Sequence, residues 1–379
     1  MLKAVRLHNF KSHPETNLEF DDSQLHALVG PNSSGKTSVL QALHYMIGIT
    51  QQYKDSFPFN YNFVKDVFQY ENSPEFITTI GQNQMSVTLS GVLGDNLREN
   101  WELTYKSKQI NNSTWSPILL SDKRLNRQRS LILSALKEYW RYSVYLKLVA
   151  ANLAKAAYSD AVTPQIEFDG SGLAPNLDYL RNEAPDKFQS LQEMLQQVVP
   201  GVKRLGVRRA KVTVDRQRLI EVDRKSISYQ ESQEMAGQEI VFDMKSGDRI
   251  PAHAISEGTI LALGLLTVMM NPNPPNLVLL DDVEQGLHPQ AQRELMSVFK
   301  QIIEANPNLQ IIFSTHSPYI VDELTPSQVH VLTNNNSGLT RCKRLDEHPD
   351  VEWAKQTLTT GEFWDAEGED WVIAEETNE

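Results

Sequence analysis

The stretch Gly30-Pro31-Asn32-Ser33-Ser34-Gly35-Lys36-Thr37 decides the fold of this chain. Leu25 to Val29, directly before it, has the composition of a short buried strand, and the apolar positions in Ser38 to Ile47 have helical spacing. A glycine-rich turn between a strand and a helix directs successive backbone N–H groups at an anion, at the positive end of the helix dipole. We therefore expect residues 30–38 to hold the phosphates of a nucleotide. The plainer alternative is a glycine turn that carries Gly-Lys-Thr by chance, which the flanking strand and helix disfavour.

The side chains of this loop predict where the parts of a bound nucleotide would lie. Lys36 would reach the β- and γ-phosphates of ATP, and the Thr37 hydroxyl would bind Mg²⁺. The predicted nucleotide contacts in this loop are Gly30, Pro31, Asn32, Ser33, Ser34, Gly35, Lys36, Thr37 and Ser38.

A second apolar run, Leu277 to Leu280, ends in the two acids Asp281 and Asp282. A continuous apolar run is typical of a strand buried on both faces of a parallel sheet. We expect Asp281 to hold Mg²⁺ and Asp282 to orient or deprotonate the attacking water, which makes Asp282 a candidate catalytic residue. Glu284 fits better as a loop acid that caps the next helix.

Two further segments complete the predicted site. His316 follows the apolar strand Leu309 to Phe313 and has hydroxyl side chains around it, which suits contact with a γ-phosphate. The alternative is that His316 is a polar residue whose hydrogen bonds are satisfied locally.

Ser256, Glu257 and Gly258 begin a strongly apolar helix. Ser256 needs no function beyond an N-cap, but a helix start before the two acids is where the signature of an ATP-binding cassette belongs. There the helix N-terminus faces the γ-phosphate held by a second subunit.

These motifs, taken together, resemble the RecF/SMC-like cassette ATPases, and within them the heads of the OLD type (overcoming lysogenization defect). The resemblance covers nearly the whole chain, from Leu2–Ser12, which is similar to the first strand and Asn-Phe-Lys-Ser turn of the family, to the Ser314–Pro318 histidine switch. It implies an α/β P-loop NTPase of the ABC-ATPase type, with a mixed sheet, an antiparallel β lobe and a helical insertion lobe. It also implies ATP and Mg²⁺ as ligands and a homodimer that closes around ATP, in which His316 is catalytic.

Three features depart from the family pattern. The family usually has Glu at the position of Asp282 and Pro at that of Val283, and the shorter acid predicts slow hydrolysis. Gln69 is a weak candidate for the glutamine of the Q-loop. OLD proteins continue into a nuclease domain of the TOPRIM type, which we expect this chain to lack.

Composition sets limits on the class of protein. The net charge of −12 argues against nucleic-acid binding over the whole surface, and 40% hydrophobic residues are ordinary for a globular protein. The single cysteine, Cys342, suits a reducing compartment, and we expect a cytoplasmic protein without a signal peptide or a membrane span.

Charge is unevenly distributed along the chain. Two basic clusters are candidates for DNA or RNA phosphates, although solvated faces or protein partners explain them equally well. The first consists of Lys203, Arg204, Arg208, Arg209 and Lys211, and the second of Lys123, Arg124, Arg127, Arg129, Lys137 and Arg141, near Trp140. Residues 362–379 hold eight acids and no base, with aromatic residues that would dock a partner or pack on the chain itself.

We expect one ATPase head over residues 1–379. Its predicted parts are an N-terminal lobe at 1–106, a helical and β insertion at 107–250, and a C-terminal lobe at 251–379 with the signature, the two acids and the histidine. Within these parts the sequence predicts a β ribbon over 202–250 and a helix over 289–305. No heptad run is long enough for a coiled-coil arm.

The predicted function is that of an ATP-hydrolysing head that regulates a separately encoded effector, a nuclease or toxin, in bacterial antiviral defence. Two alternatives stay open. One is a RecF-like ATPase of DNA repair or replication, and the other is a scaffold that binds ATP, barely hydrolyses it and holds an effector inactive.

Overall fold

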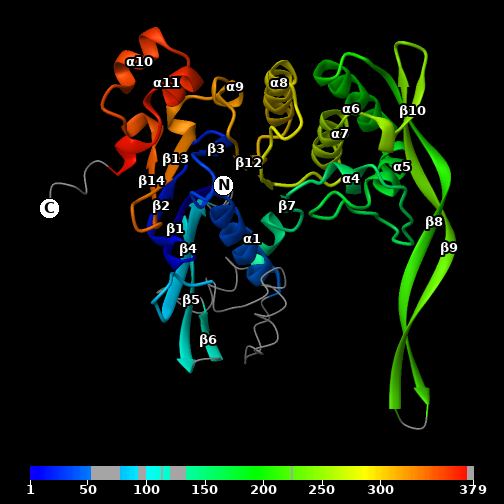
Figure 1. Cartoon of the computed structure of the whole chain (residues 1–379), viewed down its shortest axis with the longest axis horizontal. Coiled ribbons are helices and arrows are strands. Elements are labelled where there is room, and N and C mark those ends of the chain that lie inside the picture. Colours follow the sequence, from blue (N-terminus) through cyan, green and yellow to red (C-terminus); the bar gives the residue numbers. More distant parts are fainter. Residues whose placement is uncertain (53–76, 93–99, 112–113, 120–133, 223–224, 374–379) are drawn as a thin grey trace. The chain divides into compact units, whose positions relative to one another are not determined.

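The computed structural model describes residues 1–52, 77–92, 100–111, 114–119, 134–222 and 225–373 (Figure 1). Its chain divides into two compact units. The first contains Met1–Tyr145, Pro275–Glu284 and Lys300–Glu379, and the second contains Leu146–Pro274 and Gln285–Phe299. The predicted lobe limits at 106 and 250 differ from these bounds, and the signature segment lies in the second unit.

The first unit contains a mainly parallel sheet built from buried apolar strands. Strand β3 (Leu25–Val29) lies between β12 (Gln310–Ser314) and β13 (Val329–Asn334), and it is parallel to both. Strand β11 (Leu277–Leu280) pairs in parallel with β12. The full strand order is β14-β13-β3-β12-β11-β7, with β14 (Thr340–Arg344) antiparallel at one edge and β7 (Val144–Leu146) at the other. The carboxyl ends of β3, β11 and β12 therefore lie at one edge of the sheet. The predicted site residues come directly after these strand ends in the chain.

An antiparallel sheet forms the other layer of this unit. Its order is β2-β1-β4-β5-β6, from strands β1 (Leu2–Phe10), β2 (His13–Glu19), β4 (Gln84–Val92), β5 (Asn100–Asn111) and β6 (Thr114–Leu119). Helix α1 (Lys36–Gln52) contributes Val39, Leu40 and Leu43 to a core that also contains residues of both sheets. The predicted mixed sheet with an antiparallel lobe is thus confirmed.

The carboxyl-terminal part of the first unit is made of short elements. They are α9 (Pro318–Val321), η3 (Pro326–Gln328), η4 (Leu345–Glu347), α10 (Val351–Thr357), α11 (Thr360–Glu367) and η5 (Asp370–Val372). Phe363 and Trp364 are buried, so these aromatic residues of the acidic segment pack on their own chain. Helix α8 (Pro289–Ala305) has the bounds that the sequence predicts.

The second unit combines helices with a long ribbon. Helix α7 (Glu257–Met269) is buried from Gly258 to Met269, as expected of a helix that is apolar on every side. Helices α4 (Ala150–Leu153), α5 (Leu173–Glu183) and α6 (Pro185–Val198) pack on it.

Strands β8 (Val202–Val222) and β9 (Lys225–Met244) form one antiparallel hairpin, visible in Figure 1 as the two long paired arrows. The short strand β10 (Arg249–Pro251) extends the ribbon beside β9, and η2 (Ala252–Ala254) follows it. A β ribbon in this part of the chain is what the sequence predicts.

Candidate functional site

The loop between β3 and α1 has a backbone that requires glycine at two positions. Gly30 has φ 134° and Gly35 has φ 95°. A Cβ on Gly30 would lie 1.9 Å from the carbonyl oxygen of Leu332, and one on Gly35 would lie 2.6 Å from Nε2 of His13. Neighbouring strands therefore approach the loop so closely that side chains are excluded at both glycines.

Polar side chains from two hairpins hold the carbonyl groups of this loop. His13 Nε2 lies 3.1 Å from the carbonyl oxygen of Gly35, and its Nδ1 lies 3.0 Å from Oγ1 of Thr16. Asn334 Nδ2 donates to the carbonyl of Ser33 at 3.0 Å. Burial lowers the pKa of His13 to about 4, so the imidazole is neutral near pH 7. The loop is thus fixed through its carbonyl groups.

The other side chains of the loop differ in their exposure to solvent. Pro31, Asn32 and Ser33 are exposed, whereas Ser34 is fully buried. Among the described residues, Oγ of Ser34 has no hydrogen-bond partner.

Lys36 is buried at the start of α1, and its ammonium group donates to the carbonyl oxygens of Gly30 and Pro31, both at 2.8 Å. Burial lowers the pKa of Lys36, and the carboxylates of Asp282, Asp281, Glu284 and Glu369 oppose that shift. Lys36 is therefore a buried cation whose charged form several carboxylates favour.

Asp281 joins the carboxyl ends of β11 and β12 to the start of α1. Thr37 Oγ1 donates to the carboxylate of Asp281, 3.0 Å from each oxygen. Ser314 Oγ donates to Oδ1 of Asp281 at 2.7 Å and accepts from the backbone N–H of Asp282 at 2.8 Å. The hydroxyl and carboxylate predicted to hold Mg²⁺ are therefore in contact, and oxygen donors of this kind are the ligands that Mg²⁺ prefers. The residues fit the ion.

Asp282, the predicted catalytic acid, has a backbone conformation that is uncommon for a residue with a side chain, at φ 55°. Aspartate tolerates the left-handed region better than most residues do, and uncommon conformations of this kind occur at functional sites. The side chain is half-buried.

His316 follows β12 and has an exposed side chain. Its backbone N–H donates to Oε1 of Glu284 at 2.6 Å. Glu284 therefore binds the backbone of the histidine segment. The sequence predicts a different role for it, that of a loop acid capping the next helix. The strand ends bring Lys36, Thr37, Asp281, Asp282 and His316 to one edge of the parallel sheet.

The predicted signature residues begin α7 in the second unit. Ser256 is the N-cap residue by backbone geometry, yet its side chain makes no capping hydrogen bond; its Oγ lies 2.7 Å from Oγ1 of Thr259. Ser256 and Glu257 are exposed, and Gly258 lies so close to the carbonyl of Gly286 that a Cβ would be 2.4 Å from that oxygen. The simpler prediction, that the Ser256 side chain caps α7, is therefore wrong.

The first basic cluster is largely neutralised by acids of the same ribbon. Arg208 pairs with Glu239 at 2.8 Å, Lys211 with Glu234 at 3.2 Å, and Arg204 with Asp243 at 4.0 Å. These pairs weaken the prediction of a nucleic-acid surface here, because paired charges attract phosphates less.

The second basic cluster and the Q-loop candidate lie mostly outside the described residues. Lys123, Arg124, Arg127, Arg129 and Gln69 belong to segments that the structure does not describe. Of the remainder, Arg141 contacts Glu138 at 3.5 Å, and Trp140 is buried in the core rather than presented to a ligand.

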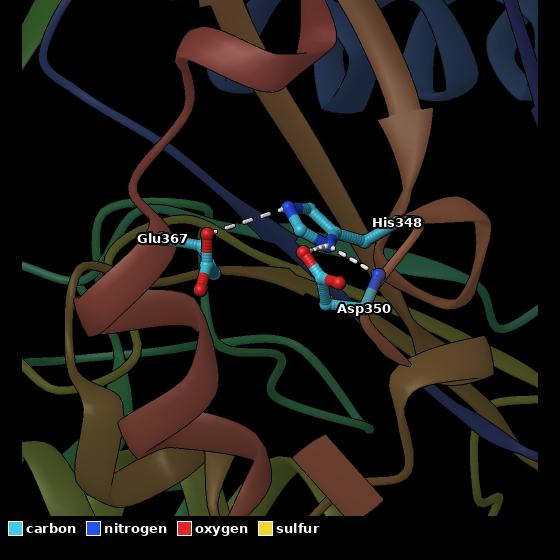
Figure 2. Close-up of side chains that lie close together, drawn as sticks. All are labelled: His348, Asp350 and Glu367. Carbon is cyan, nitrogen blue, oxygen red and sulfur yellow. Dashed lines mark hydrogen bonds and ion pairs between the residues drawn. The ribbon is translucent and has the colours of Figure 1, made fainter. Parts of the chain in front are cut away.

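A separate group of metal-ligand residues lies near the end of the chain, where Figure 2 shows His348 between Asp350 and Glu367. Nδ1 of His348 accepts a hydrogen bond from the backbone N–H of Asp350 at 3.1 Å, and Nε2 lies 3.6 Å from Oε2 of Glu367. The lone pair of Nδ1 is thus used within the chain. His348 also packs between Phe363 and Trp371, which fits a structural role.

Sequence reasoning missed the residues that support the site. The sequence indicates Ser314 only as a neighbour of the histidine, and it does not assign His13, Asn334 or Glu284 to the site. One sequence feature could have identified these residues. Each is a polar residue that lies either at the end of a strand or next to an apolar residue in the sequence.

Comparisons with known proteins bear on the fold and the family of the chain. A curated relative, the probable ATPase of retron Vc95 from Vibrio cholerae serotype O1 biovar El Tor, is 20% identical over an alignment of 381 positions. The alignment covers 87% of this chain and 73% of that protein. Two solved SMC head structures have TM-scores of 0.54. One, bound to the C-winged helix domain of ScpA, is 15% identical (90% of this chain, 96% of that chain), and the other, from Pyrococcus furiosus with the C-terminal domain of ScpA, is 13% identical (94% and 99%).

The SMC heads show the fold, which is the mixed α/β fold of such heads, and they do not single out the OLD type. The described residues contain no helix with the length and apolar character to cross a membrane. A family model described as "AAA domain, putative AbiEii toxin, Type IV TA system" matches residues 25–322, which include the loop, the two acids and the histidine. The chain therefore belongs to this family of AAA ATPase domains.

Proposed function

We propose that this protein binds ATP together with Mg²⁺, hydrolyses it slowly, and pairs with a second copy around the nucleotide. The observation that carries the proposal is the contact of Thr37 and Ser314 with Asp281, beside the buried ammonium group of Lys36. It supplies oxygen ligands for a cation and a fixed positive charge at one strand edge.

Each residue of the cluster has a distinct task in this chemistry. Lys36 and the backbone N–H groups of residues 32–36 bind the phosphates. Thr37 and Asp281 would hold Mg²⁺, which when bound neutralises phosphate charge and polarises the phosphoryl group. Asp282 orients the attacking water and accepts its proton, and His316 contacts the transferred phosphoryl group.

The exposed start of α7 supports pairing of two heads. Ser256 Oγ is not engaged with the backbone of its own helix, and the helix N-terminus carries partial positive charge. We infer that it binds the γ-phosphate held by the other copy.

We further infer that the nucleotide cycle controls a separately encoded effector, a nuclease or toxin, in a bacterial defence system. The support comes from the relatives: the family description names a toxin–antitoxin system, and the curated relative is named as a retron ATPase. A cytoplasmic location accords with this function.

One observation favours a second candidate function, that of a scaffold that binds ATP and barely hydrolyses it. Asp282 replaces the longer acid usual in such heads and stands on an uncommon backbone conformation. The RecF-like alternative receives less support, because acids on β9 pair with three of the basic residues on β8.

The direct test is phosphate release from ATP by the wild-type protein and by Asp281→Asn, with and without Mg²⁺. We expect Mg²⁺-dependent turnover by the wild type, and loss of turnover in the variant because the amide lacks the negative charge that binds the cation. ATP binding without turnover favours the scaffold, and a protein that neither binds nor hydrolyses ATP contradicts the proposal.

A further inference from the structure

We propose that Glu284 is a positioning residue that fixes His316 relative to the two acids, so that the histidine meets the transferred phosphoryl group. This inference rests on the proposed function.

The first support is the contact itself. Oε1 of Glu284 accepts from the backbone N–H of His316 at 2.6 Å. A carboxylate acceptor gives a shorter and stronger hydrogen bond than a neutral one. A bond to the backbone fixes the point from which the imidazole extends, whichever rotamer the ring adopts.

The second support is that this bond completes a series between two neighbouring strand ends. Strands β11 and β12 pair in parallel up to Leu280 and Phe313. Beyond them, Ser314 bonds to Asp281 and to the N–H of Asp282, and the N–H of Val283 donates to the carbonyl of Ser314 at 3.2 Å. Glu284 extends this series to His316, so hydrogen bonds connect the two acids to the histidine segment.

The third support is the state of the second carboxylate oxygen. Oε2 of Glu284 is buried, and in the described part of the chain it has no hydrogen-bond partner. A buried acceptor without a donor costs free energy, and such groups in native structures call for an explanation in function.

The experiment compares Glu284→Ala, which removes the acceptor, with Glu284→Gln, which keeps an oxygen at Oε1. We expect Glu284→Ala to lower kcat about tenfold to a hundredfold, the factor that corresponds to loss of a hydrogen bond to a charged group. KM for ATP should stay within about threefold, since the phosphate ligands are untouched, and Glu284→Gln should restore most of kcat. Glu304→Ala, an exposed acid on α8, serves as the matched control and should behave as wild type.

A double-mutant cycle separates positioning from an independent role. In a His316→Ala background, Glu284→Ala should have little further effect on kcat, because the group that it positions is gone. An equal loss in both backgrounds, or a KM that rises as much as kcat falls, would overturn the proposal.

A readout without turnover keeps this test distinct from that of the proposed function. Selective ¹⁵N labelling of the nine histidines gives few backbone amide signals, and His316→Ala identifies the one from His316. That amide should be protected from solvent exchange in the wild type and in Glu284→Gln, and should exchange fast in Glu284→Ala. Equal protection in Glu284→Ala overturns the contact even if ATP is hydrolysed. Loss of protection in a protein that does not hydrolyse ATP refutes the proposed function and leaves the contact standing.

Discussion

Asp282 is the residue at which this chain departs most from the family that it resembles. Its side chain is one methylene shorter than the usual glutamate, and its backbone stands at φ 55°. Because the left-handed region accepts Asp and Asn more readily than Glu, backbone and side chain are matched at this position. The backbone conformation at this position therefore favours Asp over the longer Glu.

The variant Asp282→Asn tests the role of this acid without disturbing its backbone. An amide cannot accept a proton or carry the charge that polarises water, so we expect hydrolysis to fall about 10²–10⁴-fold. ATP affinity should be preserved, because Lys36 and Thr37 are unchanged. Steady-state phosphate release and equilibrium ATP binding measure the two effects.

The companion variant Asp282→Glu restores the longer acid. If the short acid limits turnover, the variant hydrolyses ATP faster than the wild type, with a lower melting temperature from the strained φ. A wild type without measurable turnover in the presence of its partner, with both variants identical to it, shows that Asp282 is not catalytic.

Sequence reasoning identified the residues of the loop, the two acids and the histidine, and their roles remain predictions. The structure places them at one edge of the parallel sheet. The sequence alone does not identify Asn334 and Glu284 as residues that support the site. Their hydrogen bonds to Ser33 and His316 join residues that are 301 and 32 positions apart in the chain. Such contacts depend on the order of strands in the sheet, which no local pattern encodes.

At the scale of elements, long and periodic segments were predicted well. Helix α8 has the predicted bounds 289–305, and α1 was predicted but extends to Gln52, beyond Ile47. Strand β14 was missed, because the sequence Thr-Arg-Cys-Lys-Arg is short and charged. Its pairing with β13 comes from the sheet edge rather than from its own propensity.

Three buried histidines connect the strands of the first unit. His13 supports the phosphate loop, and His26 on β3 lies near His330 on β13, with ring centroids 6.3 Å apart. Burial lowers the pKa of His13 and of His26 to about 4 and that of His330 to about 3. These strands therefore pack around neutral imidazoles at pH 7.

The consequence is a loss of stability in acid. An unfolded histidine has a pKa of about 6.5, so below that pH the unfolded chain binds more protons than the folded one. Each histidine should then lower the free energy of unfolding by about 1.4 kcal/mol per pH unit, down to its folded pKa. Denaturant titrations between pH 7 and 5 measure this slope. His13→Gln should reduce it, and a slope of zero in the wild type contradicts the neutral state of the three rings.

At the scale of the whole molecule, the predicted ATP-binding residues are divided between two units. The phosphate loop and acids belong to the first unit, and the start of α7 belongs to the second. Two copies would each contribute both parts, so pairing would depend on ATP. The sequence predicted both parts from their motifs, whereas the bounds of the units arise from contacts between distant segments.

The variant Ser256→Arg tests this pairing. A bulky cation at the helix start should leave ATP binding by the monomer intact and block ATP-driven dimerisation. Size-exclusion chromatography with light scattering, on protein loaded with ATP, gives the result. A variant that pairs as the wild type does excludes Ser256 from the interface, and in a constitutive dimer single-turnover hydrolysis replaces sizing as the measurement.

The central claim is that residues 30–38 bind the phosphates of ATP, and equilibrium titration of ATP into the wild type and Lys36→Ala tests it most directly. The variant removes the buried charge that compensates the phosphates, so we predict saturable binding by the wild type and no measurable binding by the variant. A melting curve of the unliganded variant close to that of the wild type ensures that the loop, not the fold, was changed. An ATP affinity that is the same in both proteins contradicts the claim.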